Sequence, residues 1–488
     1  MRKTVTLLFC LLSIVVMAQT IDSKKEGEYY FNVSPNGRYY VGAIDASYAH
    51  FYDAVEKVSV DAEPDLVGYK INAVNNQGQV AGSNERQGGI WNQGGDWLYL
   101  PLPEDATEEE KMWYEATGIS DGGKYVVGYL AEWCTRMVVW TLQEEGIYTV
   151  DVLPIPEKDP IYKSKPQLVQ PRNISDDGTR ILARCVNDFG HVHFPLIYER
   201  QEDGSWTYKF IYPELVVKAG AEMPEYREEM TSEELEKYVA AMNAAESGYY
   251  PHCDGALMSS NGKYIAAKVG YQPEGEDYGY YLGVVFDVEK DTAIVFSELQ
   301  DASCFSVDNY GNVSLGTPST EFFRWSFISH ITTPNKIQTL TEWTKERTGG
   351  KIDLAEYMEY QINATGTKSV AEGTTYLASE GIAYLTYQEN LIETGVNEAF
   401  FVYLGEMINV SVDEVAIEKL AMYPNPTLGI INFVDEILDL VVYDIAGRKV
   451  YSQNVVDSTI DLSHLDCGTY LVVAKKDGKL IQSKIIKL

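Results

Sequence analysis

The stretch Ile119-Ser120-Asp121-Gly122-Gly123-Lys124-Tyr125-Val126-Val127-Gly128 decides how this chain folds. Its first residue is β-branched, a short polar segment with glycine follows, and an aromatic residue and two valines come next. Glycine after aspartate supplies the positive φ that a tight hairpin needs, and the preceding serine can cap the turn. The stretch therefore predicts two antiparallel strands joined by a tight turn at Gly122.

The same pattern recurs six more times, and most copies are followed by one or two further short strands with aromatic residues, as at 138–140 and 147–150. The glycines of neighbouring copies lie 41 to 56 residues apart, except for Gly178 and Gly262, whose interval of 84 residues we interpret as one unit plus an insertion. Four strands per unit at such a period are typical of β-propeller blades. Seven copies predict seven blades; because the last three copies diverge, one blade more or fewer and an array of β-sandwiches remain alternatives. The other six copies are 31–42, 71–82, 174–183, 257–267, 305–316 and 362–371.

The repeat resembles the HAF-type extracellular repeat, in which Ile-Ser-x-Asp-Gly precedes two valines, a glycine and an aromatic strand. The resemblance covers roughly residues 28–405 and implies the propeller fold without implying an activity. We therefore expect an all-β chain in which residues 19–409 form a seven-bladed β-propeller.

Four long segments interrupt the regular spacing, and each is expected to join the outermost strand of one unit to the innermost strand of the next. Because neighbouring strands of a blade are antiparallel, all four are then expected on one rim, opposite the tight glycine turns. Long loops on one side of a rigid scaffold are where binding sites usually lie. Loop growth without function is the alternative, because long surface loops cost little free energy. The four segments are 101–114, 153–170, 212–253 and 341–358.

The longest of these segments, 212–253, is predicted to contain a helix. Thr231 and Glu234 have the spacing of a capping box, in which each side chain bonds the backbone N–H of the other residue. Glutamates crowd the first turn, where the helix dipole favours negative charge. We expect a helix over 232–246 whose apolar stripe packs on the propeller. The stripe consists of Leu235, Val239 and Met242.

Aromatic residues are frequent in and beside the long segments, and the whole chain has 36 tyrosines. Aromatic faces stack on sugar rings and peptide side chains, and neighbouring carboxylates accept hydrogen bonds from hydroxyls and amines. We predict a ligand-binding set of such residues, and the alternative for each is that it only covers a loop. The set is Trp113, Tyr114, Trp133, Tyr162, Tyr226, Tyr249, Tyr250, Tyr271, Tyr278, Trp343 and Tyr357.

Acidic residues outnumber basic residues by 72 to 39, which gives a net charge of −33 at pH 7. Such a surface repels nucleic acid and anionic lipid, so neither is expected as a partner. The simplest reason for the charge is that it keeps an exported protein soluble. The apolar fraction of 45% is ordinary and provides for a substantial core.

No catalytic motif stands out, and no cofactor is expected. The sequence lacks the zinc-protease motif His-Glu-x-x-His, the nucleophile motif Gly-x-Ser-x-Gly, phosphate-binding loops and calcium loops. Two histidine-containing groups, 191–193 and 252–254, match no known ligand spacing, so no metal site is predicted. The five cysteines beyond residue 18 are odd in number and widely spaced, which favours buried free thiols. A disulfide between two of the first four of these cysteines is the alternative.

The N-terminus has the features of an export signal. Arg2 and Lys3 form a positively charged segment at the very beginning, and residues 5–16 form an apolar run. Ala18 is a small residue of the kind that precedes a signal-peptide cleavage site. We predict a signal peptide over 1–18 that is removed. The run is too short to cross a bilayer as a stable helix, and no other stretch is long and apolar enough.

The last part of the chain carries an ordered set of motifs. It begins Tyr423-Pro424-Asn425-Pro426-Thr427-Leu428-Gly429, and further motifs follow at 441–448, 460–465 and 468–470. The short apolar runs between them suit a small Ig-like antiparallel sandwich of about seven strands. A polar linker is expected at 410–422.

This segment resembles the C-terminal sorting domain of type IX secretion cargo in Bacteroidetes bacteria. The resemblance covers 423–488 and implies passage across the outer membrane through the type IX secretion machinery, which is the expected partner. The matching residues are Tyr423, Pro424, Asn425, Pro426, Gly429, Asp444, Gly447, Gly468 and Tyr470.

These observations favour a secreted or cell-surface protein that binds a glycan, peptide or matrix ligand at the loop-rich rim without catalysis. The alternative is a polysaccharide hydrolase or lyase that uses carboxylates at the central channel. Carboxylates with raised pKa values at the channel mouth would favour the enzyme, and an apolar plug would argue against it. A structural role at the cell surface is a third hypothesis.

Overall fold

The computed structural model of the chain divides into two compact units, residues 1–407 and 408–488. Strands dominate both units, and the helices are few and short. Residues 19–487 are described except for 26–28, 45–47, 61–68, 94, 132–135, 145, 159–165, 188–191, 212, 219–220, 222–226, 228, 246–247, 252–255, 275–278, 318–324, 358–359, 363–367, 371–373, 390–396, 405–421, 424–426, 428, 434–436, 445–448, 457–458, 466–467 and 477–478.

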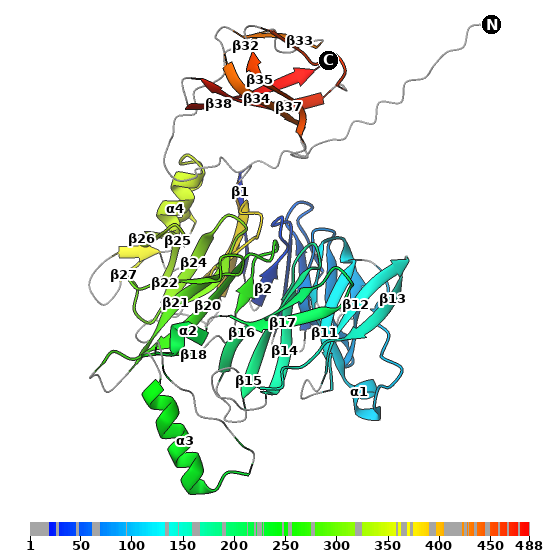
Figure 1. Ribbon diagram of the computed structural model, residues 1–488, viewed down its shortest axis with the longest axis vertical. Helices are drawn as coiled ribbons and strands as arrows, with labels where there is room; N and C mark the ends of the chain where they lie inside the picture. Colours follow the sequence, from blue (N-terminus) through cyan, green and yellow to red (C-terminus); the bar gives the residue numbers. More distant parts are fainter. Residues whose placement is uncertain are drawn as a thin grey trace, which may run out of the picture. The chain divides into compact units, whose positions relative to one another are not determined.

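Seven sheets of four or five antiparallel strands make up most of the described part of the first unit (Figure 1). The sheets are numbered in chain order. In the first six sheets, the strands follow one another along the chain from the innermost strand to the outermost. These are β2 (Tyr29–Val33), β3 (Tyr39–Ile44), β4 (Tyr48–Asp53) and β5 (Val58–Val60); β6 (Tyr69–Val74), β7 (Gln79–Asn84), β8 (Gln87–Asn92) and β9 (Leu98–Tyr99); β10 (Tyr114–Ile119), β11 (Tyr125–Leu130), β12 (Arg136–Glu144) and β13 (Ile147–Val152); β14 (Pro166–Ile174), β15 (Arg180–Asn187), β16 (Val192–Arg200) and β17 (Trp206–Phe210); β18 (Tyr249–Pro251) and β19 (Leu257–Met258), both beside β20 (Tyr264–Tyr271), then β21 (Tyr280–Asp287) and β22 (Thr292–Phe296); and β23 (Ser303–Val307), β24 (Asn312–Thr317), β25 (Trp325–His330) and β26 (Thr333–Thr339).

The seventh sheet closes the ring with the two ends of the unit. Its order is β29 (Tyr376–Leu377), β30 (Ala383–Glu389), β31 (Asn397–Tyr403) and β1 (Thr20–Lys25). β1 therefore comes from the start of the chain and pairs antiparallel with β31 over its whole length.

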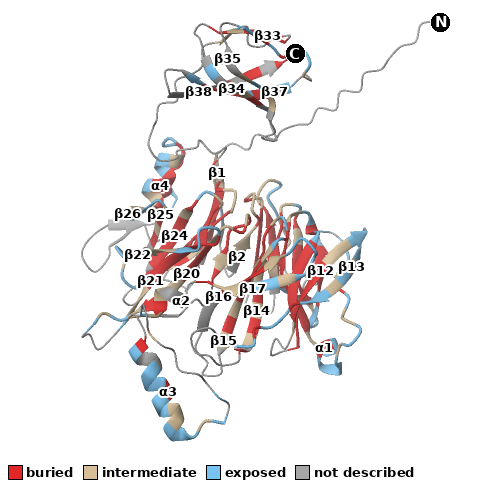
Figure 2. Cartoon of the chain, in the orientation of Figure 1, coloured by how far each residue is buried: buried red, intermediate tan, exposed pale blue. Residues whose placement is uncertain are grey.

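The sheets stand around a common axis. Every consecutive pair of sheets, including the seventh and the first, shares a cluster of buried residues. Figure 2 colours buried residues red, and they run along many of the propeller strands. Each sheet also contributes to the wall of one central cavity. This architecture is a β-propeller, as the repeat predicts. The cavity residues, one from each sheet in order, are Phe31, Ala73, Gly118, Asn173, Leu257, Ser306 and Tyr376.

A tight turn joins the first and second strands of each sheet, and these seven turns are called the inner turns. In the third sheet the Ser120 N–H donates to the Tyr125 carbonyl at 2.8 Å, and the Gly123 N–H donates to the Ser120 carbonyl at 3.0 Å. The Ser120 hydroxyl accepts from the Tyr125 N–H at 2.9 Å, which is the predicted cap. The first residues of the other six inner turns are Ser34, Asn75, Ser175, Ser259, Asp308 and Ala378.

The prediction of the seventh repeat at 362–371 is wrong. β27 (Tyr360–Ile362) and β28 (Lys368–Val370) form a separate two-stranded pair there. The seventh inner turn instead ends at Gly381, which has φ +69° and donates its N–H to the Ala378 carbonyl at 2.8 Å. Ala378 occupies the position at which the other inner turns have a capping side chain. The turn at Ala378–Gly381 therefore lacks the capping residue by which the other turns were recognised in the sequence.

The long connections occupy both rims of the ring, so the prediction of a single rim is wrong for 341–358. α1 (Glu108–Met112) and α3 (Ser232–Ala245) lie on the rim away from the inner turns, whereas α4 (Leu340–Arg347) lies on the opposite side in Figure 1. Arg347 of α4 donates from Nη2 to the carbonyl of Gly381, an inner-turn residue, at 3.4 Å. The apolar side chains of α4 draw it there, because they pack against the sixth and seventh sheets. The remaining short helices are α2 (Pro213–Val216), η1 (Asp121–Gly123) and η2 (Leu354–Glu356).

The helix predicted in the longest connection is confirmed as α3, with its capping box. The Glu234 N–H donates to Thr231 Oγ1 at 3.3 Å, and the Thr231 N–H donates to Glu234 Oε2 at 2.9 Å. The packed stripe differs from the prediction, because Tyr238 is buried and Val239 is 37% exposed. Leu235 packs as predicted beside Tyr238, and the Met242 side chain lies outside the described residues.

The second unit is an antiparallel sandwich, as its sequence predicts. Its core lies between two sheets and includes Ile431, Leu440, Val472 and Ile485. The predicted linker lies outside the described residues apart from Met422. The strand orders are β32 (Met422–Tyr423), β33 (Ile430–Phe433), β36 (Thr459–Asp461) in one sheet, and β35 (Lys449–Val456), β34 (Ile437–Asp444), β37 (Gly468–Lys476), β38 (Lys479–Lys487) in the other.

Candidate functional site

The inner turns converge at one end of the central channel. The Asn36 N–H donates to Asn76 Oδ1 at 2.8 Å, and the Glu380 N–H donates to the Pro35 carbonyl at 2.8 Å. Asn76 Nδ2 also donates to Glu380 Oε1 at 3.0 Å, although these residues belong to the second and seventh sheets, which are not neighbours. Such a contact requires the turns to meet near the axis, so the channel is narrow at this rim.

Three carboxylates, Asp121, Asp176 and Glu380, interact at the inner-turn rim. Burial raises the pKa of Asp176 to about 6, a hydrogen bond with Ser260 opposes this rise, and the charges of Asp121 and Glu380 add to it. Burial also raises the pKa of Glu380, a hydrogen bond from Asn76 opposes the rise, and the charge of Asp121 adds to it. This repulsion favours a proton or a hydrogen-bond donor between the groups.

Sequence reasoning missed these carboxylates, although the repeat contains the signal for them. Asp121 and Asp176 both occupy the second position of an inner turn, directly after the capping serine. Second-position residues of four turns line the channel, which shows that this position faces the axis. Alignment of the repeats by position would therefore have placed both carboxylates at the channel. The four lining residues are Pro35, Asp176, Ser260 and Ser379.

We expect the Asp176→Asn variant to be more stable than the parent protein at pH 7.5, by about 1–2 kcal/mol, because the folded protein holds this carboxylate at a raised pKa. The stability that this group contributes is present below the ordinary aspartate pKa of 3.8 and is lost as the pH rises through about 6. The gain should therefore shrink towards zero at pH 4. Chemical denaturation at pH 4, 5 and 7.5 measures it.

Asp203→Asn is the matched control for this prediction. Hydrogen bonds from Ser205 lower the pKa of Asp203, which lies in an exposed turn. No gain at pH 7.5 is expected from this variant. If both variants changed the free energy of unfolding at pH 7.5 by the same amount, the explanation given for Asp176 would be contradicted.

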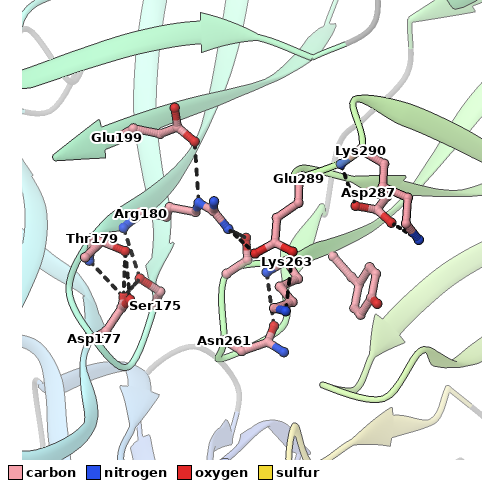
Figure 3. A network of polar contacts seen from close by, with 12 residues as sticks. Ser175, Asp177, Thr179, Arg180, Glu199, Asn261, Lys263, Asp287, Glu289 and Lys290 are labelled. Carbon is pink, nitrogen blue, oxygen red and sulfur yellow. Dashed lines mark hydrogen bonds and ion pairs between the residues drawn. The ribbon is translucent and has the colours of Figure 1, made fainter. Parts of the chain in front are cut away.

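An ion-pair network links the fourth and fifth sheets at the same rim (Figure 3). Arg180 Nε lies 3.4 Å from Glu199 Oε1 within its own sheet, and Arg180 Nη1 lies 3.7 Å from Glu289 Oε1 in the next sheet. Arg180 Nη1 also donates to the Gly262 carbonyl at 3.1 Å, and Lys263 Nζ lies 3.3 Å from Glu289 Oε2. The pairs are partly exposed and each stabilises the fold by at most about 1 kcal/mol. Their role is to hold two inner turns in register.

Among the described residues, two adjoining cavities in the channel share Phe31, Arg172, Leu257 and Tyr376 in their walls. The narrower, of about 110 Å³, reaches the inner turns, where Asp176 and Ser379 line it. The wider, of about 290 Å³, lies nearer the opposite rim, because Ser303 at the start of β23 lines it. The residues that line the wider cavity are Phe31, Arg172, Ala256, Leu257, Lys268, Ser303, Cys304, Phe305 and Tyr376.

Part of the predicted aromatic set forms a ladder on the fifth sheet, at the rim away from the inner turns. Tyr249 pairs in register with Tyr271, and Tyr271 pairs with Tyr280. The ring centroids are 4.6 Å and 5.6 Å apart, and the side chains of Tyr249, Tyr271 and Tyr280 are half-buried. Tyr280 was missed in the sequence because its place in the ladder depends on strand register.

Two members of the predicted set are buried and cannot present a ring face to a ligand. Tyr114 is 5% exposed and Trp343 is 7% exposed, and both pack in hydrophobic clusters. Trp113 is half-buried beneath the Arg86 guanidinium, which lies 4.7 Å from its ring centroid. Tyr357 is exposed. Trp133, Tyr162, Tyr226, Tyr278 and the side chain of Tyr250 lie outside the described residues.

The remaining chemical candidates from the sequence find no support in the described residues. Among these, no group of three His, Cys, Asp or Glu side chains is placed to hold a metal ion. The side chains of both histidines at 191–193 and all of 252–254 lie outside the described part of the chain. Cys185 and Cys304 are buried, and neither forms a disulfide with another described residue.

The motifs of the second unit occupy turns and strands of the sandwich. Gly429 has φ +143°, and a Cβ at this position would lie 2.3 Å from Ser463 Oγ. Gly468 begins β37, and Tyr470 is buried in the core. Residues 421–488 match the family described as "Secretion system C-terminal sorting domain". These residues are a type IX sorting domain.

The sorting domain shows that the protein is secreted or attached to the outer-membrane surface, and that it engages the secretion machinery. Among the described residues, no helix has the length and apolar character needed to cross a membrane. No curated protein matches the chain. Of the predicted motif residues, Tyr423 is exposed, Asp444 ends β34, and Pro424, Asn425, Pro426 and Gly447 lie outside the described residues.

Solved structures similar to the chain include a lyase, a β-propeller domain and a set of WD40 repeats. The oligogalacturonate lyase of Vibrio parahaemolyticus has a TM-score of 0.42 and 10% identity, over 79% of this chain and 97% of that one. The β-propeller domain of Cps50 (Swd1) from Myceliophteria thermophila has a TM-score of 0.41 and 8% identity, over 78% and 98%. The RRP9 WD40 repeats have a TM-score of 0.41 and 9% identity, over 78% and 97%. No function is carried over from these structures.

Proposed function

We propose that this protein is an exported, non-catalytic binding protein that holds an extracellular glycan or peptide at the rim away from the inner turns. The tyrosine ladder of Tyr249, Tyr271 and Tyr280 is the observation that carries the proposal. The three half-exposed rings lie side by side, with angles of 43° and 68° between neighbouring ring planes, and each offers a separate face or edge to sugar rings or flat side chains. The ladder stands on paired strands, which hold the rings in place more firmly than a loop would.

The surroundings of the ladder support the same use. Tyr249 also packs against a small cluster that contains Val216 of α2 and Tyr238 of α3, so the longest connection buttresses the ladder. Exposed glutamates of α3, such as Glu233 and Glu236, lie on this connection and can accept hydrogen bonds from hydroxyl or amine groups.

We expect Tyr280→Ala in the mature full-length protein to weaken binding to its array-identified ligand roughly fivefold to tenfold, because one stacked ring contributes about 1 kcal/mol. Glycan and peptide arrays followed by calorimetry measure the effect. Tyr99→Ala is the control, since Tyr99 is 49% exposed on β9 of the second sheet, outside the ladder. Equal affinities of the two variants would remove the ladder from the binding site.

A polysaccharide hydrolase or lyase is the second candidate, and the raised pKa of Asp176 favours it. An acid with a pKa of about 6 can donate a proton near neutral pH. One observation argues against an enzyme. Glu380 accepts a hydrogen bond from Asn76 of another inner turn, so this carboxylate has a structural role in holding the turns together. Release of reducing ends from a polysaccharide by the parent protein, and its loss in Asp176→Asn, would establish the enzyme.

A further inference from the structure

Five of the seven sheets have a β-bulge in their first strand, just before the inner turn. A bulge is one extra residue that has no partner on the neighbouring strand, and it changes the direction in which a side chain points. In the first sheet, the pairing of Tyr30 and Asn32 with the second strand leaves Phe31 as the extra residue. The extra residues of the five sheets are Phe31, Asn72, Thr117, Arg172 and Phe305.

The side chains at the bulge position have different environments. Asn72 Nδ2 donates to the Ala116 carbonyl at 2.8 Å, and Thr117 is buried, so these two side chains are used within the protein. Phe31 and Phe305 instead line the wider cavity of the channel. The same repeat position therefore provides a contact between sheets in one place and a cavity wall in another.

Phe31, Phe305 and Tyr376 line the wider cavity from the first, sixth and seventh sheets, and these three residues are called the aromatic wall. The three sheets are neighbours in the closed ring, and all three side chains are half-buried. In the described part of the chain, neither phenylalanine belongs to a hydrophobic cluster, whereas Tyr376 packs against one. A ligand that covers the two phenylalanine rings therefore removes apolar surface from water.

Gly316 determines where the ring of Phe305 lies. This glycine is on β24 opposite Ser303, and a Cβ at its position would lie 2.1 Å from the Phe305 ring. The ring therefore lies close against the backbone of β24, where only glycine leaves enough room. A side chain that is already held in place loses little conformational freedom when a ligand binds. This part of the aromatic wall is thus in position before a ligand enters.

The cations of the wider cavity are not assigned to the ligand. Arg172 and Lys268 line this cavity, and both already interact with other groups of the protein. The Lys268 ammonium, for example, lies 4.5 Å from the ring centroid of Tyr281. The chemistry of the ligand is therefore inferred from the aromatic wall. Two of its three rings are phenylalanines, which offer a flat apolar group contact area and offer the hydroxyls of a sugar no hydrogen bond.

We propose that the aromatic wall holds one aromatic side chain of an extracellular peptide. The volume of about 290 Å³ is near the lower end for ligand pockets, so it suits one ring-sized group. Because Ser303 at the start of β23 lines this cavity, a peptide on the rim away from the inner turns can insert a side chain while its backbone stays outside. Aromatic side chains in pockets are common anchors of such complexes. This site is separate from the tyrosine ladder and stands without it.

Calorimetry on the mature full-length protein tests the site with short peptides that are blocked at both ends and carry no charge. Gly-Phe-Gly and Gly-Trp-Gly should bind, and Gly-Ala-Gly and methyl glucoside should not. Phe31→Ala and Phe305→Ala should each weaken binding roughly tenfold, because one ring of the wall is lost. Tyr310→Ala is the matched control, since Tyr310 is 48% exposed in the sixth inner turn, outside the cavity. Thermal unfolding shows whether each variant is folded.

Two further variants keep the proposal testable if the alanine variants fail to fold. Phe305→Leu keeps an apolar side chain and removes the ring, so the protein should fold and the affinity for Gly-Phe-Gly should fall severalfold. Gly316→Ala leaves all three rings in the chain and displaces the ring of Phe305, so it should also weaken binding. Unchanged affinity in every one of these cavity variants would overturn the site.

Free indole separates a peptide from a small aromatic molecule as the ligand. Tighter binding of Gly-Trp-Gly than of indole supports a peptide, and equal or tighter binding of indole would overturn it. The site is also overturned if neither aromatic tripeptide binds, or if methyl glucoside binds in their place. Tyr280→Ala should leave the binding of the tripeptides unchanged, so this site and the tyrosine ladder can fail independently.

Discussion

Removing residues 408–488 is expected to abolish the appearance of the protein outside the cell. The remaining chain should accumulate in the periplasm in folded form, because residues 1–407 are a compact unit with a core of their own. The sorting domain directs passage across the outer membrane, so its loss should reduce the extracellular fraction to background. Cell fractionation with immunoblotting in a bacterium that has the type IX machinery measures this change.

Two glycines of the sorting domain provide a matched pair of point variants. Gly429→Ala should sharply reduce export, because φ is +143° there and the new Cβ would lie 2.3 Å from Ser463 Oγ. Gly468→Ala should be exported normally, because the nearest atom to its Cβ would lie 3.7 Å away. Export of both variants at the parent level would show that the machinery does not require this fold. A reporter fused to 408–488 tests whether the domain is sufficient for export.

The propeller could be predicted from the sequence because its repeats carry local chemistry. A capping residue and a glycine at positive φ mark six inner turns within a few residues, so the strands beside them follow directly. The seventh turn could not be found this way, because Ala378 provides no cap and the true signal is reduced to Gly381. The copy at 362–371 matched the pattern in sequence and formed a small separate pair.

The candidate sites were less accessible to sequence reasoning, because they depend on register and packing between sheets. Tyr114 and Trp343 look like surface residues in loop-rich segments, yet hydrophobic clusters bury them. Lys268 lines a channel cavity from β20, the second strand of the fifth sheet, and this place depends on strand register. No short motif records such an arrangement, whereas the acidic position of the inner turns was visible in the aligned repeats.

Deleting residues 20–25 is expected to destabilise the propeller more than any substitution considered above. β1 supplies the outermost strand of the seventh sheet and pairs with β31 from Thr20 opposite Tyr403 to Lys25 opposite Glu398. Without it β31 becomes an unpaired edge, and such an edge promotes association with other chains. The variant should show a strongly lowered unfolding temperature and should aggregate during size-exclusion chromatography. A signal sequence joined directly to residue 26 delivers it to the periplasm.

Point variants separate the pairing of β1 from its side-chain packing. Ile21→Asp places a charge against the cluster that includes Tyr384 and Val402, and should cost about 2–3 kcal/mol. Ser23→Asp changes an exposed position of the same strand and should cost less than about 0.5 kcal/mol. A synthetic peptide of residues 19–26 should partly restore the deleted protein, because the ring needs the strand and not its covalent link. A deletion variant that unfolds at the same temperature as the parent protein would mean that the ring closes without β1.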